Sequence, residues 1–383
     1  MKILFVCQQY IHSARWINQL KDTHHEVFIF DCLDREVHQD LQWTTYFGNW
    51  SKRKIKYIKG EHYLKKKFPN FYNKISSKLM VTATEKLTQI IKEIQPDLVH
   101  SLEMQSQTYP LVKVSEKINF NWAYFSWGSD LFFYRYDKFH QPKIQKVLSR
   151  INYLFTDNSR DVNIAREIGF SGESFSKLPG GGGYDLEKIK NYIQPFKSRN
   201  LILIKGYDHW AGKAIKVLEA LELIIESIKN YDIYVYSAHD NVIDKINQLN
   251  SKYNLDIQYS SRNNEISQES LLEKFGQAII AIGNSVTDGI PNTLLEAIIL
   301  GAFPIQSNPG GVSEDYIKDG LNGVLINNPL DVEEISNKIQ QALANDELLQ
   351  NANSINEKIS LKLSDTMIKQ RVIDIYDKIE RDL

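Results

Sequence analysis

The sequence predicts an α/β protein with two doubly wound domains, and three observations carry that prediction. Short apolar runs that suit buried parallel strands alternate with stretches of helical periodicity. The alternation starts again after residue 200, as expected if a second sheet follows the first. A chain of 383 residues is also longer than one hydrophobic core usually serves. We therefore expect two sheets, each with its own core.

The first half supplies one set of elements. Strands are expected at 2–8, 26–32, 98–102, 122–127, 153–157 and 175–178. Helices are expected at 12–21, 82–94, 143–150 and 160–168. This alternation predicts βαβ units, in which a parallel sheet is covered by helices on both faces.

The second half repeats the pattern. Strands are expected at 201–207, 232–237, 255–259, 278–282, 303–306 and 323–326, and a helix at 212–229. The polar stretch 191–200 contains Pro195 and marks the boundary. We expect an N-terminal domain over 1–194, a second domain over 195–364, and a C-terminal helix over 365–383 that crosses back to the first domain. Open α/β sheets bind ligands beyond the carboxyl ends of their strands, so a cleft between the domains is the expected site.

Charge and cysteine content narrow the function classes. The formal net charge of −1 gives no reason to expect nucleic acid as a partner. Cys7 and Cys32 fall in predicted buried strands, and the opening apolar run is too short for a secretory signal. No apolar stretch approaches the roughly 18 residues of a membrane span. A reduced, cytoplasmic protein is expected, with membrane contact at most peripheral and at the inner face.

A segment between Lys52 and Lys78 is strongly basic, although the whole chain is nearly neutral. Residues 51–80 hold ten lysines and arginines against one acidic residue, Glu61, so the segment carries 10 − 1 = +9 and the remainder −10. Aromatic residues are interleaved with the lysines, as in segments that bind anionic membrane surfaces. A solvated surface is the other interpretation, because Gly60 and Pro69 interrupt any single amphipathic helix.

The most informative motif follows the expected strand 278–282. A turn with Gly289 and Pro291 leads into a helix whose first turns carry Glu296, and Asp288 lies eight positions before that residue. N–H groups at a helix start have no intrahelical partner and suit an anionic ligand. The two carboxylates can accept hydrogen bonds from sugar or ribose hydroxyls. The motif therefore indicates a nucleotide-sugar site.

Residues 285–305, with their continuation over 307–314 and 319–323, closely resemble the signature of retaining, family-4-type glycosyltransferases (glycosyl transferases group 1) of the GT-B fold. The resemblance is strong over about 201–345 and weaker over 1–200. It implies two Rossmann-like domains that face an interdomain cleft. It also implies that Asp288 contacts the transferred sugar and Glu296 the ribose. Asp288 stands where the family usually has Glu, so the resemblance does not fix the identity of the transferred sugar. The other donor-binding positions implied are Ser285, Gly289, Ile290, Pro291 and Asn292.

The resemblance extends to the loop after the expected strand 201–207. Family members usually place an Arg and a Lys there to clamp the donor diphosphate. Lys213 near the helix start is the matching cation, and we assign it with Asp288 to the catalytic group. The loop contains no Arg, so Lys205, followed by Gly206, is the candidate second cation. A solvated lysine is the plainer alternative at either position.

Four residues of the first domain are candidates for the acceptor side. Trp127 stands where the family commonly has His, so it either packs on a sugar face or belongs to the core. Asp130 is expected to orient the turn that follows. His12 and Arg15 lie after the first strand and are either acceptor contacts or ordinary surface residues.

Absent motifs complete the prediction. No Asp-x-Asp triplet occurs and no His/Cys cluster has metal spacing, so neither a metal nor another cofactor is expected. The predicted function is a metal-independent, retaining transfer of a hexose-type sugar from a nucleotide-diphosphate sugar to a cell-surface glycan, lipopolysaccharide or lipid-linked oligosaccharide. A nucleotide-sugar epimerase on the same fold and a non-catalytic nucleotide-sugar-binding protein are the alternatives.

Overall fold

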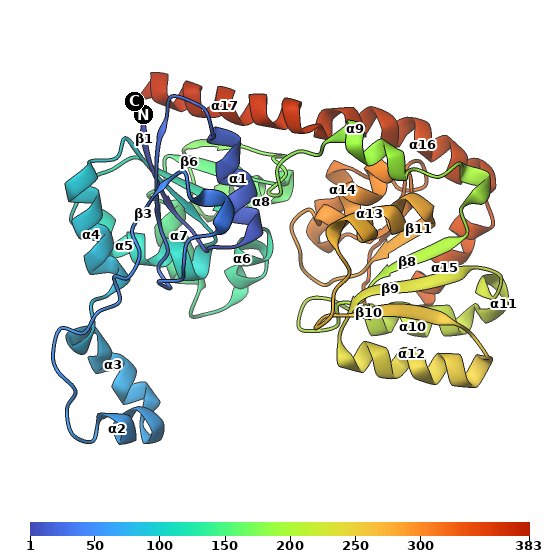
Figure 1. Cartoon of the computed structure of the whole chain (residues 1–383), viewed down its shortest axis with the longest axis horizontal. Coiled ribbons are helices and arrows are strands. Elements are labelled where there is room, and N and C mark those ends of the chain that lie inside the picture. Colours follow the sequence, from blue (N-terminus) through green and yellow to red (C-terminus); the bar gives the residue numbers. More distant parts are fainter. The chain divides into compact units, whose positions relative to one another are not determined.

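The structure is a computed structural model that describes the backbone of residues 1–383 and every side chain except those of Asn70, Asn73 and Lys74. Lys74, which the sequence places in the basic segment, therefore lies outside the described side chains. The chain forms two compact units (Figure 1). Unit 1 comprises Met1–Thr156, Asp161–Gly182 and Arg371–Leu383, and unit 2 comprises Asp157–Arg160 and Gly183–Gln370.

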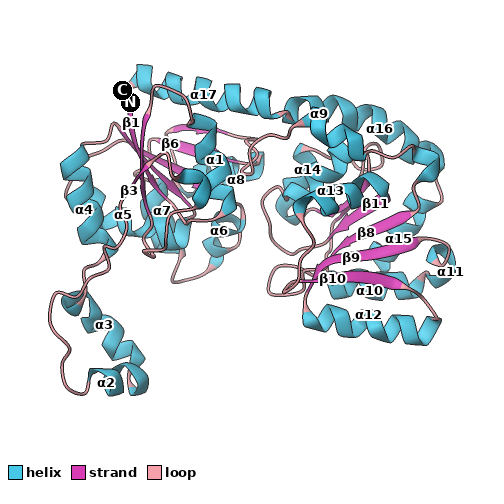
Figure 2. Cartoon of the chain, in the orientation of Figure 1, coloured by secondary structure: helices cyan, strands magenta, loops and turns pink.

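Unit 1 is built on a seven-stranded sheet with the order β3-β2-β1-β4-β5-β6-β7 (Figure 2). Its strands are β1 (Lys2–Val6), β2 (Glu26–Phe30), β3 (Thr45–Tyr46), β4 (Leu98–Leu102), β5 (Trp122–Ser126), β6 (Tyr153–Thr156) and β7 (Glu173–Phe175). Every neighbouring pair is parallel. Every residue of β4, β5 and β6 is buried, as expected for a parallel sheet with both faces covered.

Helices of unit 1 follow these strands. They are α1 (Ile11–Ile17), α2 (Glu61–Lys67), α3 (Pro69–Leu79), α4 (Ala83–Ile94), α5 (Tyr109–Ser115), α6 (Ser129–Phe132), α7 (Gln141–Leu148) and α8 (Ser159–Ile168). The start of α4 shows why the sequence folds locally as it does. Thr82 and Glu85 form a capping box that satisfies N–H groups at the helix start, and Leu87, Ile90 and Ile91 face the core.

Unit 2 holds a six-stranded parallel sheet with the order β10-β9-β8-β11-β12-β13. Its strands are β8 (Leu201–Lys205), β9 (Asp232–Ala238), β10 (Ile257–Ser261), β11 (Ala278–Gly283), β12 (Phe303–Ser307) and β13 (Val324–Ile326). Its helices are α9 (Leu186–Ile189), α10 (Ala214–Leu223), α11 (Ile225–Ile228), α12 (Asp240–Tyr253), α13 (Gln268–Gln277), α14 (Asn292–Leu300), α15 (Val332–Leu343) and α16 (Asp346–Ser360). The expected α/β fold with two doubly wound sheets is confirmed.

The last helix, α17 (Asp365–Asp382), contributes its final turns to unit 1. Tyr376 is fully buried there against the rings of Phe5 and Phe155. Its hydroxyl accepts a hydrogen bond from Trp16 Nε1 at 3.1 Å and lies 2.7 Å from His100 Nδ1. The end of α17 is therefore a part of the unit 1 core.

Local details differ from the predicted elements. The helix expected over 212–229 is broken, because Ile224 leaves the helical region with φ −122° and ψ 29° between α10 and α11. The strand expected at 175–178 ends at Phe175, since Lys177 has a positive φ of 56°. Within the described chain, no helix combines the length and apolar character that crossing a bilayer requires.

Candidate functional site

The carboxyl ends of β8 and β11 meet at one edge of the unit 2 sheet, because these strands are parallel neighbours. Lys205 is the last residue of β8, and Asp288 follows β11 in the next loop. Lys205 Nζ lies 3.9 Å from Asp288 Oδ2, and both side chains are partly open to solvent. The structure thus brings together a cation and a carboxylate that the sequence assigns separately to the donor site.

The loop after β8 adds further positive charge. Gly206 packs so closely against β9 that an added Cβ would lie 2.6 Å from the Cα of Ala238. Lys213 precedes α10, and its ammonium donates a hydrogen bond to the His209 carbonyl at 2.7 Å. The pKa of His209 is lowered, first by burial and then by nearby His239, Lys205 and Lys213. Two lysines, Lys205 and Lys213, thus lie close to His209 at this edge, where their charges could neutralise a diphosphate.

Two backbone N–H groups of the Gly289 turn already have partners. Gly289 N–H donates to Asp288 Oδ1 at 3.0 Å, and Ile290 N–H donates to Asp157 Oδ2 at 2.9 Å. The N–H groups of Gly289 and Ile290 are therefore not open to an anion, contrary to what the sequence suggested for this turn. Asn292 begins α14 after the extended N-cap Pro291, and the first N–H groups of that helix have no intrahelical partner.

Arg160 is a residue that sequence reasoning missed. It is 9% exposed, and its two terminal nitrogens donate to the carbonyl of Asp288 at 3.0 Å and that of Pro309 at 2.7 Å. One guanidinium therefore fastens the loop after β11 to the loop after β12. The sequence placed Arg160 at a helix start and gave no sign of its partners, which lie 128 and 149 positions away.

Glu296 is more enclosed than a simple ribose contact would suggest. It is 4% exposed, and Oε1 accepts a hydrogen bond from Gln268 Nε2 at 2.9 Å. Ser285 is also buried, and its N–H donates to Ser307 Oγ at 2.8 Å. The ribose role of this buried carboxylate stays a prediction.

A cluster of aromatic and basic residues at the ends of β8, β9 and β10 was not predicted either. The guanidinium of Arg262 lies 4.6 Å from the centre of the Tyr207 ring, and Lys205 Nζ lies 4.8 Å from the same ring. Trp210 is 54% exposed nearby in the chain. A flat aromatic surface beside cations can hold a planar, anionic group such as a nucleotide.

In unit 1, Asp130 lies under the turn that follows β5. Its carboxylate accepts hydrogen bonds from Trp127 N–H at 2.9 Å, Met104 N–H at 3.0 Å and the Tyr124 hydroxyl at 2.7 Å. Burial, and then the charge of Glu103, raises the pKa of Asp130 to about 7. Asp130 is therefore a buried residue that orients the turn, as the sequence suggested.

The structure brings His12 and Trp127 together, edge to face, with ring centres 6.3 Å apart. Trp127 is partly exposed and His12 is exposed. Arg15, on the same helix as His12, is partly buried, and its carbonyl accepts from Gln19 Nε2 at 3.0 Å. His12 and Trp127 therefore offer an accessible aromatic surface, whereas the role of Arg15 stays a prediction.

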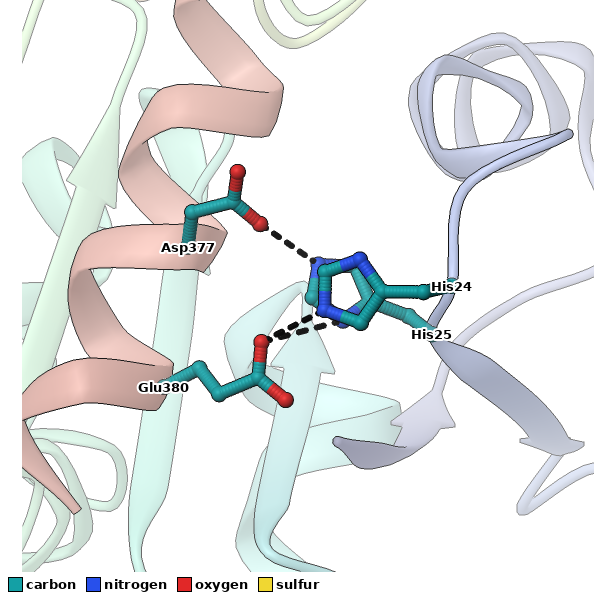
Figure 3. A group of neighbouring side chains, drawn as sticks. All are labelled: His24, His25, Asp377 and Glu380. Atoms are coloured by element: carbon teal, nitrogen blue, oxygen red, sulfur yellow. Dashed lines mark hydrogen bonds and ion pairs between the residues drawn. The ribbon is translucent and has the colours of Figure 1, made fainter.

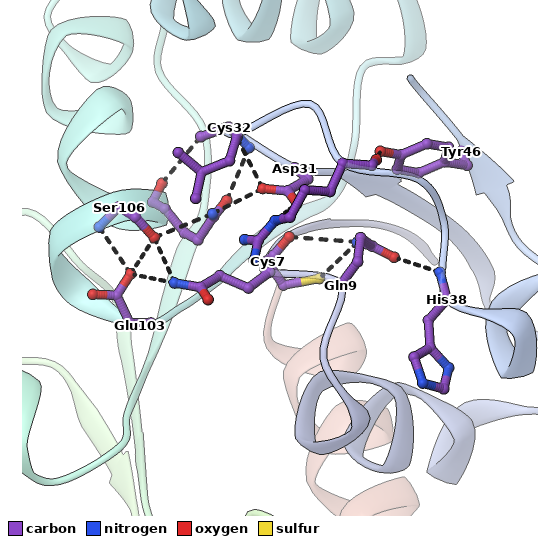
Figure 4. Close-up of polar contacts among 12 residues, drawn as sticks. Cys7, Gln9, Asp31, Cys32, His38, Tyr46, Glu103 and Ser106 are labelled. Atoms are coloured by element: carbon purple, nitrogen blue, oxygen red, sulfur yellow. Dashed lines mark hydrogen bonds and ion pairs between the residues drawn. The ribbon is translucent and has the colours of Figure 1, made fainter. Parts of the chain in front are cut away.

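A polar network occupies the carboxyl ends of β1, β2 and β4 (Figure 4). Glu103 follows β4 with a φ of 74°, rare for a residue with a side chain, and accepts from the N–H groups of Gln105 and Ser106, both at 2.8 Å. Asp31, fully buried after β2, accepts from Gln107 Nε2 at 2.9 Å. Strain and buried charge together at a strand edge are typical of functional sites.

The two cysteines lie beside this network. Both thiols are free and buried, and burial raises the pKa of each well above its usual range. They are therefore unreactive in the folded chain.

Two family models match this chain. Residues 252–359 match the family model for glycosyl transferases group 1, and residues 2–158 match that for glycosyl transferase 4-like proteins. The chain belongs to the group 1 glycosyltransferases of the GT-B fold. No curated protein sequence matches it.

Solved structures with the same fold include other glycosyltransferases. A glycosyltransferase from Rickettsia africae has a TM-score of 0.71 and 13% identity, with 100% of this chain and 99% of that chain covered. Anabaena HepE in complex with UDP has a TM-score of 0.69 and 12% identity, covering 99% and 100%. The lipopolysaccharide outer core galactosyltransferase WaaB has a TM-score of 0.68 and 15% identity, covering 99% and 100%. At such identities the likeness shows the fold.

Proposed function

We propose that this glycosyltransferase moves a hexose-type sugar from a nucleotide-diphosphate sugar to a cell-surface glycan or lipid-linked oligosaccharide, with retention and without a metal ion. The observation that carries the proposal is the meeting of Lys205 and Asp288, 3.9 Å apart, at the carboxyl ends of β8 and β11, with Lys213 in the loop that follows β8. The complexes of Anabaena HepE with UDP and with UDP-glucose support a nucleotide-sugar donor.

In this mechanism the protein lowers the barrier by positioning and by charge. Lys213 and Lys205 neutralise the departing diphosphate, aided by the first N–H groups of α14. Asp288 accepts hydrogen bonds from hydroxyls of the transferred sugar, and Glu296 from the ribose. The glycosidic bond to the diphosphate breaks while the acceptor oxygen approaches the same face of the sugar. The departing phosphate oxygen takes the acceptor's proton, so retention needs no enzyme nucleophile.

The test incubates purified full-length protein with a panel of nucleotide-sugars and measures both free nucleotide and the sugar product. Nucleotide release that increases with an acceptor supports transfer, and retained anomeric configuration by NMR supports retention. An altered sugar without nucleotide release would instead identify an epimerase. Binding without either product would identify a non-catalytic protein. Unchanged turnover after chelation with EDTA is expected, and its loss in protein that stays folded by circular dichroism would overturn the metal-independent mechanism.

Lys205→Met and Lys213→Met test the site itself, and Lys229→Met is their control. Lys229 is an exposed lysine after α11, just before β9, and so lies at the opposite edge of the sheet. Each site variant is expected to reduce kcat/KM at least tenfold, about 1.4 kcal/mol of transition-state stabilisation. Glu296→Ala is expected to weaken nucleotide binding in calorimetry. Unchanged binding in that variant would refute the ribose assignment.

The acceptor side of the proposal rests on the basic segment. Figure 1 shows α2 and α3 as a helical hairpin away from the strands of the unit 1 sheet. Gly60 caps α2 with φ 88° and Pro69 starts α3, so the segment forms two helices. Glu61, the buried first residue of α2, pairs at 2.7 Å with Arg53 from the stretch before the hairpin.

The outside of this hairpin is apolar as well as cationic. Tyr63, Phe68 and Phe71 of the hairpin are large and exposed, as are Ile55, Tyr57 and Ile58 in the stretch just before α2. Tyr57 alone is 81% exposed, with the Arg53 guanidinium 3.9 Å from its ring centre. Exposed aromatic residues between lysines suit the headgroup region of an anionic bilayer, where a lipid-linked acceptor is found.

Vesicle sedimentation tests this contact with the full chain. Wild-type protein should bind vesicles containing anionic lipid and not neutral vesicles. Lys65→Gln/Lys66→Gln/Lys67→Gln removes three charges at about 1 kcal/mol each, so affinity should fall about 100-fold. A control triple variant, Lys358→Gln/Lys362→Gln/Lys369→Gln, lies outside the hairpin. Equal binding by both triple variants would refute the membrane role.

A further inference from the structure

Four side chains with metal-binding atoms gather in unit 1 from two segments that lie far apart in the sequence (Figure 3). His24 and His25 directly precede β2, and Asp377 and Glu380 lie one turn apart on α17. Each offers one ligand atom, and these atoms all lie within 4.8 Å of one another. None of the four belongs to the residues assigned above to donor or acceptor.

The inner pair of this cluster has an unusual feature. His25 Nε2 and Asp377 Oδ1 are both buried, and neither has a hydrogen-bond partner among the described residues. The His25 side chain is 0% exposed. Buried polar atoms are nearly always hydrogen-bonded, but these two face each other as an ion pair at 3.4 Å without a hydrogen bond, an arrangement that a bound ion would explain.

The distance between these atoms fits a metal better than a hydrogen bond. His25 Nε2 lies 3.4 Å from Asp377 Oδ1, beyond the usual range for N–H···O. Two ligands at about 2.1 Å from one ion, at the tetrahedral angle, lie about 3.4 Å apart. The pair is therefore already spaced like one edge of a tetrahedral site.

His24 and Glu380 can complete the tetrahedron. His24 Nε2 lies 2.6 Å from Glu380 Oε2, so the two atoms must separate slightly to share an ion. His24 is 60% exposed and can make that movement. Glu380 Oε1 accepts from the Met1 amino group at 2.5 Å, which leaves Oε2 for the ion. Zn²⁺ binds imidazole nitrogen and carboxylate oxygen together, whereas Ca²⁺ and Mg²⁺ prefer oxygen alone.

We propose that His24, His25, Asp377 and Glu380 bind one Zn²⁺ ion, which fastens the last turns of α17 to the sheet of unit 1. Such a closed four-ligand site is structural rather than catalytic. Asp377 lies 352 positions after His25. A site built from such distant segments leaves no local metal-binding spacing in the sequence, so the lack of that spacing does not exclude it. The site is independent of the donor chemistry proposed above.

Calorimetric titration of untagged, EDTA-dialysed protein with ZnCl₂ tests the proposal. One equivalent is expected to bind, and hydrogen exchange in residues 371–382 is expected to slow. Asp377→Asn keeps the side-chain shape and should weaken Zn²⁺ binding at least tenfold. Asp382→Asn removes an exposed carboxylate of the same helix and should bind as the wild type does.

Co²⁺ substitution provides a second, spectroscopic measurement. Tetrahedral coordination is expected to give an intense visible absorption that Asp377→Asn and His25→Gln remove. If His25→Gln does not fold, the absorption of Asp377→Asn and Glu380→Gln tests the proposal instead. Thermal unfolding in EDTA should first show that these two variants are as stable as the wild type without metal. Absence of stoichiometric binding, or wild-type affinity in Asp377→Asn, would overturn the proposal.

Discussion

Gly289→Ala should disturb the loop between β11 and α14, which we propose to bind the donor, through a single hydrogen bond. A Cβ at this position would lie 2.3 Å from Asp157 Oδ2, the atom that accepts the Ile290 N–H at 2.9 Å. Asp157 is 8% exposed and Ile290 7%, so the displaced groups cannot turn to solvent. A hydrogen bond to a charged group contributes about 1.5 to 3 kcal/mol. The variant should lose about that much stability.

A double-mutant cycle isolates this cause. Asp157→Ala alone should cost about 1.5 to 3 kcal/mol, but Gly289→Ala in that background should add about 0.5 kcal/mol or less, because the clash has gone. Urea unfolding measures each variant, and calorimetry measures donor affinity, which should fall about tenfold if the loop must re-form its bond on binding.

Gly180→Ala is the matched control. Nothing lies within 4 Å of a Cβ at Gly180, so the same substitution should be nearly neutral. If Gly289→Ala is as stable as this control, or costs as much with Asp157 removed as with it present, the reasoning is wrong.

Three further predictions concern unit 1. Tyr376→Phe removes the hydroxyl that accepts from Trp16 and contacts His100, so urea unfolding should show a loss of about 1 to 3 kcal/mol. Thr82→Ala should cost about 1 kcal/mol through loss of the capping box, and Thr88→Ala, within the same helix, should cost less. The raised pKa of Asp130 means that the folded chain holds this proton more tightly than the unfolded chain; its stabilising contribution is present below about pH 4 and is lost as the pH rises through about 7. The urea midpoint of Asp130→Asn relative to the wild type should therefore rise between pH 5 and pH 8, and a constant difference would contradict the assignment.

The architecture follows from local patterns that a sequence displays directly. The run 278–282 is apolar throughout, and it forms β11 at the centre of its sheet. The two-residue β3 is too short to leave such a pattern. The break at Ile224 also escaped prediction, because apolar periodicity continues across it.

The site could be predicted only in part, for a physical reason. Asp288 and Lys205 stand at strand ends, where a parallel sheet is bound to bring side chains together. Arg160 and Asp157 reach the Asp288 loop from more than 120 positions away, through contacts to backbone atoms. Such contacts depend on carbonyl and N–H positions rather than on side-chain identity, so no motif records them.

The buried thiols of Cys7 and Cys32 have a practical consequence. They are the only two cysteines of the sequence, and both lie in unit 1. A thiol-alkylating reagent can therefore modify the native chain only while unit 1 is locally open, and unit 2 contributes no signal. The rate of alkylation, followed by mass spectrometry, therefore measures how often unit 1 opens, and the measurement needs no engineered label or substitution.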